Sequence, residues 1–160
     1  AGGGPIEHGF FMTRDILARM RDNQVAWTPT FCPVHVQWAH PEWVGWSAQT
    51  VGHLRRILDH HAEHLQLADA MGVTLLLGTD AGSMGVPHGL AVFDEIDRYL
   101  EAGLSLAATL RAASATARRT RSSCHGDLGS NWSGKCSQNA VVCISCSGME
   151  RLPAPTFSIV

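Results

Sequence analysis

The sequence predicts an α/β fold organised around a short parallel sheet. Strand-like apolar stretches alternate with amphipathic helical stretches along the chain, which is typical of parallel βαβ units. Residues 73–78, VTLLLG, are continuously apolar, as expected of a strand that is covered on both faces. Gly72 and Gly103 follow the last residues of two helical stretches, where a left-handed residue commonly ends a helix.

The first thirty residues contain two expected strands and the helix between them. Residues 5–9, PIEHG, form a short extended stretch. A helix follows over 12–23, because Thr13 suits the N-cap and apolar residues recur on one side. Residues 24–30, QVAWTPT, favour a strand that ends at Pro29.

The middle of the chain is expected to hold a loop, a long helix and the apolar strand. Residues 31–46 are rich in proline and tryptophan and are expected to form a long loop. Ser47 is the expected N-cap of a helix that runs to about Met71. Its apolar positions recur at steps of three and four residues, which predicts one buried face: Val51, Leu54, Leu58, Leu65 and Ala68.

Two further helices and a tail complete the expected order. Residues 89–103 form an amphipathic helix, and Ser105 caps another that reaches residue 119. From residue 120 onward the chain is rich in serine, glycine and cysteine and has no helical period. We therefore expect a structured region over 1–119 and an irregular tail over 120–160, interpreted as the remnant of a small β segment or a frameshifted reading.

Composition excludes several function classes. Twelve Lys and Arg against fourteen Asp and Glu, with a formal charge of −2, give no electrostatic case for nucleic acid. No apolar run approaches the ~20 residues of a membrane span. Five cysteines without a secretory signal indicate reduced thiols and a cytoplasmic location. The missing initiator Met suggests that the chain begins partway through a longer one.

Polar groups that could carry chemistry follow the expected strands. His8 and Asp80 end two of them, and His88 lies one loop later. Parallel strands open on the same face, so these groups could converge there. An imidazole and a carboxylate suit a divalent cation such as zinc, and a carboxylate beside metal-bound water could accept its proton. The alternatives are an ordinary loop histidine at 8, a turn residue at 80 and a capping or hydrogen-bonding residue at 88.

Other constellations give weaker indications. His60 and His64 lie one turn apart, a two-ligand metal face in principle, but the helix pattern favours a solvated histidine face. The cysteines at 124, 136, 143 and 146 with His125 fit no common zinc-finger spacing well. Four tryptophans could wall a substrate pocket beside His35 and His40, or simply pack the long loop. Phosphate-binding glycine motifs and a nucleophile elbow are absent from the sequence.

Four stretches in register carry a family resemblance. PIEHGFFM, VAWTPT, GVTLLLGTDAG and the run from PHGLAVF to AASATA resemble the last third of amidohydrolase-superfamily barrels, in the imidazolonepropionase-like and prolidase-like branch. The resemblance covers residues 5–117 and implies a partial (β/α)8 TIM barrel, covering roughly its last three strands and their helices. It further implies a metal-dependent hydrolase that cleaves carbon–nitrogen bonds with metal-activated water.

The resemblance assigns roles residue by residue. At the position of His8, binuclear members of the family have a metal ligand and mononuclear members have a contact to substrate or water; we expect His8 to be a metal ligand. Asp80 is implied to be both a metal ligand and the general base. His88 contacts substrate, and we expect His35 to do the same from the long loop. The implied cofactor is one or two divalent cations, of which zinc is the first choice. The implied substrate is a small amide, a cyclic amide or a dipeptide.

Departures from the family pattern limit that expectation. In the family, a metal-binding H-x-H, a lysine and a further histidine all precede the stretch that corresponds to the one around His8. The chain begins only seven residues before His8, so these residues are absent from it. Two ligands cannot complete a zinc coordination shell. We therefore expect a hydrolase fragment that is inactive alone. The alternative is a non-catalytic remnant, or a half-barrel that needs an oligomer or a missing N-terminal segment.

Overall fold

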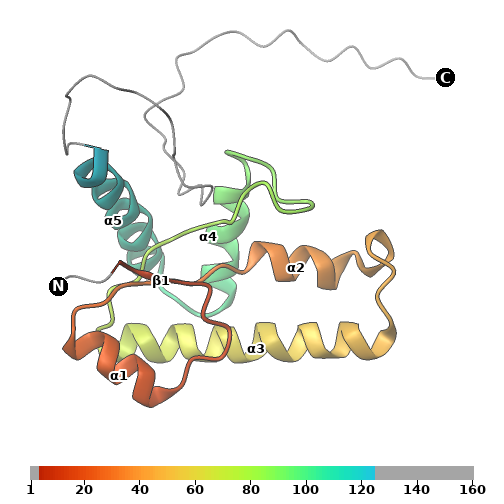
Figure 1. Ribbon diagram of the computed structural model, residues 1–160, viewed down its shortest axis with the longest axis horizontal. Helices are drawn as coiled ribbons and strands as arrows, with labels where there is room; N and C mark the ends of the chain where they lie inside the picture. The colour runs from red at the N-terminus through yellow and green to blue at the C-terminus, as the bar shows by residue number, and fades with distance from the viewer. Residues whose placement is uncertain (1–3, 125–160) are drawn as a thin grey trace, which may run out of the picture.

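The computed structural model describes residues 4–124, and the side chains of residues 4–115. Five α-helices, one short 3-10 helix and two strands make up the described part of the chain (Figure 1). In chain order these are β1 (Ile6–Glu7), α1 (Arg14–Asp22), β2 (Trp27–Thr28), α2 (Cys32–Ala39), η1 (Pro41–Trp43), α3 (Ala48–Met71), α4 (Ala91–Glu101) and α5 (Leu106–Cys124).

The predicted partial (β/α)8 barrel is wrong, because the described chain is mostly helical and has one small sheet. β1 and β2 are parallel and two residues long, with Ile6 opposite Trp27 and Glu7 opposite Thr28. The apolar run 73–78 adds only one isolated parallel bridge, between Leu75 and Trp27. Barrel strands are hydrogen-bonded on both sides, whereas the neighbours within residues 4–124 support only these few pairs.

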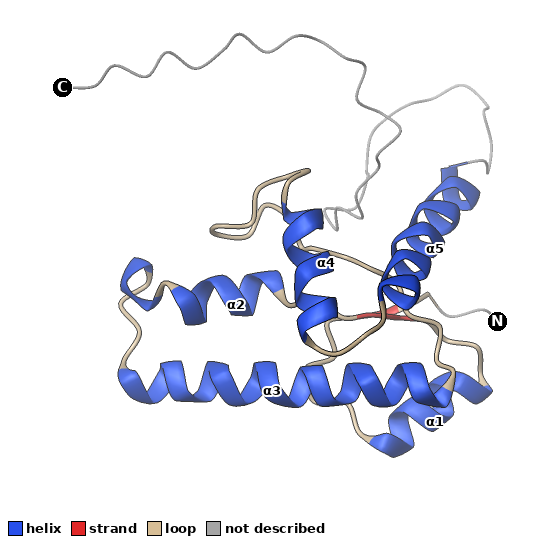
Figure 2. Cartoon of the chain, turned by 180° about the vertical axis from the view of Figure 1, so that it is seen from behind, coloured by secondary structure: helices blue, strands red, loops and turns tan. Residues whose placement is uncertain are grey.

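The helices lie on both sides of the extended segments. In both views α1 and α3 lie on one side, and α4 and α5 lie on the other (Figures 1 and 2). α2 runs beside α3 and also contacts α4. The core between these layers contains the fully buried side chains of Leu17, Trp27, Leu65 and Tyr99.

Local sequence signals correctly predict the helix termini around α1 and α3. The Thr13 hydroxyl accepts a hydrogen bond from the backbone N–H of Ile16 at 3.3 Å, and Ser47 does the same for Thr50 at 3.2 Å. Gly72 ends α3 with φ of 77°, in the left-handed region. The predicted buried face of α3 is confirmed at Leu58, Leu65 and Ala68, and His61 joins it: three apolar residues and one imidazole.

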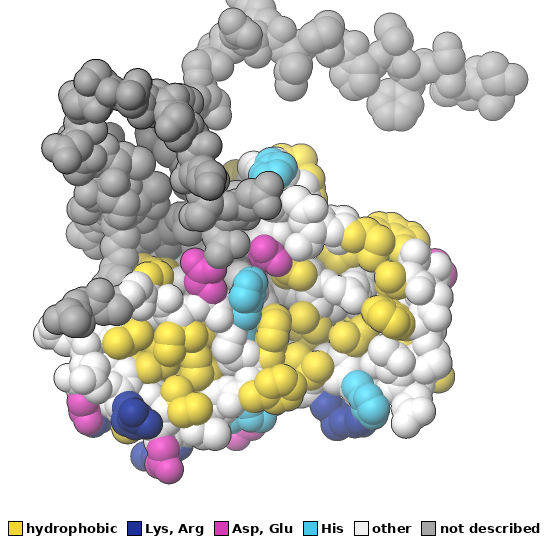
Figure 3. Space-filling view, viewed as in Figure 1, with side chains coloured by type: hydrophobic (Ala, Val, Ile, Leu, Met, Phe, Trp, Pro, Cys, Tyr) yellow, Lys and Arg dark blue, Asp and Glu magenta, His cyan; other side chains and the backbone are white. Residues whose placement is uncertain are grey.

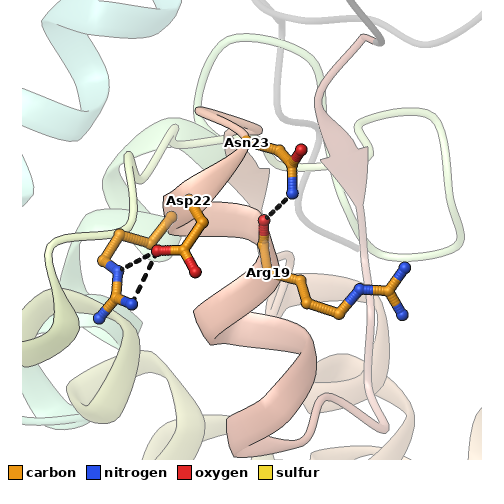
Figure 4. A network of polar contacts seen from close by, with 4 residues as sticks. Arg19, Asp22 and Asn23 are labelled. Atoms are coloured by element: carbon orange, nitrogen blue, oxygen red, sulfur yellow. Dashed lines mark hydrogen bonds and ion pairs between the residues drawn. The ribbon is translucent and has the colours of Figure 1, made fainter.

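The C-terminal end of α1 is capped by Asn23 (Figure 4). The Asn23 side-chain amide donates to the carbonyl oxygen of Arg19 at 2.7 Å, and its backbone N–H reaches the same oxygen at 3.0 Å. Arg21 and Asp22 form an exposed ion pair at 2.7 Å beside them. Gln24 then turns the chain with φ of 54°, so the helix cannot continue.

The predicted long loop over 31–46 is also wrong, because α2 and η1 occupy most of it. α2 has no capping side chain at its own N-cap, Phe31. The buried carboxylate of Glu95 on α4 supplies the cap instead. It accepts hydrogen bonds from the backbone N–H groups of Phe31 at 2.8 Å and Cys32 at 3.0 Å. This helix therefore depends on a residue more than sixty positions away.

Apolar side chains also lie on the surface (Figure 3). The most exposed are Phe11, Leu90, Phe93, Leu106 and Trp43. None of the helices in the described residues combines the length and the apolar character that a membrane crossing requires. α5 continues through the predicted boundary at residue 119 to Cys124, and the rest of the predicted tail lies outside the described residues. The side chains of the four cysteines at 124, 136, 143 and 146 and of His125 lie outside them too.

Candidate functional site

His8 directly follows β1, and three hydrogen bonds hold it, two at its backbone and one at its side chain. Its N–H donates to the carbonyl oxygen of Thr28 at 3.0 Å, and its own carbonyl accepts from the Trp27 indole at 2.9 Å. Its side-chain Nδ1 lies 2.7 Å from the Thr30 hydroxyl. The φ of His8 is 60°, a left-handed conformation that costs a non-glycine residue about 1 kcal/mol or more.

Gly9 continues this turn and must be a glycine. Its φ is 67°, and a Cβ added there would lie 2.5 Å from the terminal methyl of Met12 and 2.9 Å from the Trp27 indole nitrogen. The tight approach lets the indole N–H reach the His8 carbonyl. The position of His8 therefore depends on close packing as well as on strand pairing.

Asp80 follows the apolar run and is the second non-glycine residue of the site in the left-handed region, with φ of 51°. One of its carboxylate oxygens, Oδ2, accepts a hydrogen bond from the Ser83 hydroxyl at 3.0 Å. Its carbonyl accepts from the Ser83 N–H at 3.3 Å. Asp80 thus organises the turn that follows it, and its half-buried carboxylate remains partly open to solvent.

The three extended segments bring His8 and Asp80 to the same end of the sheet. Ile6 and Leu75 both pair with Trp27 in parallel, so the three segments run in one direction. Gly78 packs on the next residues, because a Cβ added there would lie 2.5 Å from Thr28 Cγ2. We refer to the three polar residues that follow these segments as the strand-end cluster: His8, Thr30 and Asp80.

Thr30 is a member of the cluster that sequence reasoning missed. It is buried, and its hydroxyl orients the His8 ring. The T-P-T stretch suggested a strand but gave Thr30 no role. Thr30 follows β2, and β2 pairs with β1, the strand that precedes His8. This pairing could have identified Thr30, but only the structure shows its register.

A pocket of about 210 Å³ lies between α2, α4 and the loop after Asp80. It is lined by Cys32, His35, Val36, Gly85, Val86, Asp94 and Arg98. His35 therefore lines this cavity, and it does so from a helix rather than from the predicted loop. We refer to this cavity as the α2–α4 pocket.

His35 is neutral and oriented by Arg98. The guanidinium can only donate, so His35 Nε2 accepts its hydrogen bond at 3.0 Å and Nδ1 carries the proton. Burial lowers the pKa of His35, and the positive charge of Arg98 lowers it further. Arg98 itself forms an ion pair with Glu101 at 2.6 Å. Arg98 is a pocket residue that the helical pattern of α4 gave no reason to select.

His88 lies in the same loop as Asp80 and is exposed. A Cβ added to Gly82 would lie 3.4 Å from His88 Nε2, so the imidazole packs against the turn that follows Asp80. This position is compatible with a contact to a bound molecule and equally with a loop residue that stabilises its own turn.

The residues described supply only part of a metal site. His8 and Asp80 are ligand types that zinc accepts, and the Thr30 hydroxyl contacts His8 at Nδ1 rather than at Nε2. Within residues 4–124, however, no three His, Cys, Asp or Glu side chains come together as a metal-binding group. His8 and Asp80 are therefore suitable ligand types for zinc, but two ligands are fewer than a catalytic zinc site uses.

Comparisons with known proteins add no assignment. No family model matches the chain, and neither the curated proteins nor the solved structures give a significant match. The resemblance to the amidohydrolase superfamily therefore stays a prediction from the sequence.

Proposed function

We propose that this chain contributes to a metal-dependent hydrolase that acts on the carbon–nitrogen bonds of small amides, cyclic amides or dipeptides. The single observation that carries the proposal is the shared position of His8 and Asp80 at one end of three parallel segments. Both residues adopt a left-handed conformation, and such strained positions concentrate at functional sites.

The residues of the strand-end cluster take distinct roles in this proposal. When bound, a divalent cation such as zinc lowers the pKa of a bound water towards ~7. We propose that the Thr30 hydroxyl accepts a hydrogen bond from His8 Nδ1–H, which would leave Nε2 as a ligand. The Asp80 carboxylate would be a second ligand and would accept the proton of the attacking water. Ser83 holds one of its oxygens in place.

The α2–α4 pocket supports the proposal that the substrate is a small molecule. Its volume of about 210 Å³ suits a small molecule rather than a long peptide. His35 presents Nδ1–H as a donor for an amide carbonyl, since Arg98 occupies its Nε2. His88 is the second proposed substrate contact. The free, buried thiol of Cys32 agrees with the proposed cytoplasmic location.

Additional ligands must come from outside the described residues. Zinc in catalytic sites uses three protein ligands, and His8 and Asp80 are two. We therefore expect no amide hydrolysis above a metal blank from this chain alone. The alternative function, a non-catalytic chain that associates with another segment, is favoured by the same shortage of ligands within residues 4–124.

Zinc binding tests the proposal directly. Zn²⁺ is titrated calorimetrically into the 160-residue chain after its accessible thiols are alkylated, so that cysteines do not compete. His8→Ala and Asp80→Asn should each weaken one binding event by about tenfold or more, because each removes one ligand. Asp22→Asn is the matched control, since that carboxylate is exposed on α1. Binding unaffected by both site variants would contradict the proposal.

A further inference from the structure

The α2–α4 pocket contains two charged side chains of opposite sign on one helix. Asp94 and Arg98 both line it from α4. Residues four positions apart on a helix are neighbours on its surface, so one small ligand can reach both side chains. Among the described residues, the Asp94 carboxylate has no hydrogen bond or ion pair. The pocket therefore offers an unpaired carboxylate to a bound molecule.

The Arg98 guanidinium is held at a single nitrogen. Nη1 lies 3.0 Å from His35 Nε2 and 2.6 Å from a carboxylate oxygen of Glu101. Nη1 has two N–H groups, so these two contacts use both of them. Within the part of the chain that the structure describes, Nε and Nη2 have no partner. This second edge of the guanidinium is a planar fork that can bind a carboxylate through two parallel hydrogen bonds.

The rest of the pocket is small and largely apolar. Val36 lines it from α2, and Val86 lines it from the loop that follows Asp80. The buried Cys32 also contributes to this apolar part. The volume of about 210 Å³ is below the ~300 Å³ at which pockets for drug-sized ligands begin. The cavity therefore suits a ligand with one short apolar group.

The two charges select the kind of ligand. A simple anion on Arg98 would lie near the negative charge of Asp94, and a simple cation on Asp94 would lie near the positive charge of Arg98. A neutral ligand would leave both charges unpaired. An α-amino acid has an ammonium group and a carboxylate on the same carbon atom, so it can pair with both side chains at once.

We propose that the α2–α4 pocket binds a free α-amino acid with a short apolar side chain. The carboxylate binds the Nε–Nη2 edge of Arg98, and the ammonium group binds Asp94. The side chain packs between Val36 and Val86. Such a ligand has no amide bond to cleave, so the site goes beyond the proposed hydrolase function. A bound amino acid would compete with any substrate that entered the same pocket.

A matched series of ligands tests the need for both charges. L-valine is titrated into the ¹⁵N-labelled 160-residue chain at pH 7, and the backbone amide signals of Val36 and Val86 are followed by NMR. Isobutylamine is valine without its carboxylate, and isovalerate is valine without its ammonium group. We expect saturable shifts with valine, and binding at least about tenfold weaker for the other two compounds. No saturable shift with valine, or equal binding of all three compounds, would overturn the proposal.

Substitutions on α4 test the two charged residues. Arg98→Lys keeps the positive charge but removes the planar fork, so valine binding should weaken by about tenfold. Asp94→Asn should weaken it by about fivefold, because this carboxylate is exposed and partly screened by solvent. Asp97→Asn, at an exposed position of the same helix outside the pocket, is the matched control and should leave binding unchanged.

Circular dichroism shows whether each variant keeps its helices. If Arg98→Lys does not, Asp94→Asn and the ligand series decide the outcome. Unchanged valine binding in Asp94→Asn, or an equal loss in Asp97→Asn, would overturn the proposal.

The amino-acid site and the proposed metal site fail separately. Valine binding should need no zinc and should persist in His8→Ala and Asp80→Asn. Valine binding without any zinc binding would support the amino-acid site and contradict the metal proposal alone. Zinc binding without valine binding would contradict the amino-acid site alone.

Discussion

Glu95 and His61 are both buried ionisable residues, but their surroundings are opposite in kind. The Glu95 carboxylate accepts two backbone N–H groups at the start of α2. Among the described residues the His61 imidazole has no hydrogen-bond partner at either ring nitrogen. It lies among aromatic rings, of which Phe31 is the nearest, at a centroid distance of 4.6 Å. The buried Glu95 carboxylate thus provides the acceptor that the first backbone N–H groups of α2 require. The buried His61 ring instead packs among aromatic rings as an apolar side chain would. The fold tolerates this because the imidazole stays neutral.

The difference predicts opposite responses to pH. Burial raises the pKa of Glu95 to about 7, although the N–H groups of Phe31 and Cys32 oppose this rise. Burial lowers the pKa of His61 to about 3, and the neighbouring His60 lowers it further. The stability that Glu95 contributes is therefore lost as pH rises from about 4.5 through 7, and that of His61 is lost as pH falls from about 6.5 through 3.

Removing the Glu95 carboxylate should produce the largest effect. Glu95→Ala leaves two buried N–H groups without an acceptor and opens a cavity, so we expect a loss of about 3–5 kcal/mol in the free energy of unfolding. Urea denaturation followed by circular dichroism measures it. Asp97→Ala, at an exposed position of the same helix, should change stability by no more than about 0.5 kcal/mol. Equal effects of the two variants would contradict the capping role of Glu95.

Acidification tests the other half of the comparison. Between pH 6.5 and 4 the burial of neutral His61 should cost the folded state about 3 kcal/mol, because the unfolded chain binds the proton more readily. His61→Phe should flatten this acid limb and leave stability at pH 7 little changed, since the ring already lies in an aromatic environment. Urea unfolding repeated over this pH range checks both. If the free energy of unfolding of His61→Phe still fell by the same amount between pH 6.5 and 4, other groups would be responsible for the loss of stability.

Tyr99 extends the comparison to a neutral group with partners. Its fully buried hydroxyl lies 2.9 Å from the carbonyl oxygens of both Pro29 and Leu76, and so connects two of the extended segments. Tyr99→Phe should lower the free energy of unfolding by about 1–2 kcal/mol. Thermal unfolding monitored in parallel with wild type measures this loss. A change below about 0.5 kcal/mol would show that the bridge contributes little.

Thr79 should give the smallest effect, because its buried hydroxyl has no partner within the part of the chain that the structure describes. Thr79→Val keeps the side-chain shape and removes the unsatisfied oxygen, so stability should be unchanged or rise by up to about 1 kcal/mol. The same urea denaturation as for Glu95 measures it. A loss comparable to that in Tyr99→Phe would mean that the hydroxyl has a partner, such as a buried water.

The strand-end cluster was only partly accessible to sequence reasoning. His8 and Asp80 end extended stretches, and that pattern is local and can be read directly. Thr30 enters the cluster through strand register, and Arg98 reaches the α2–α4 pocket through the packing of α4 on α2. Both depend on contacts between segments that are far apart in sequence. No periodicity or motif encodes such contacts.

By itself the sequence determined that α1, α3, α4 and α5 exist, and it determined where α1 begins and where α3 begins and ends. Capping by Thr13 and Ser47, the left-handed turn at Gly72 and the apolar face of α3 depend on residues within one or two turns of each other. The tertiary structure alone decided how long the strands are and that α2 exists. A strand needs hydrogen-bonding neighbours to continue, and α2 needs the carboxylate of Glu95 to satisfy its first N–H groups.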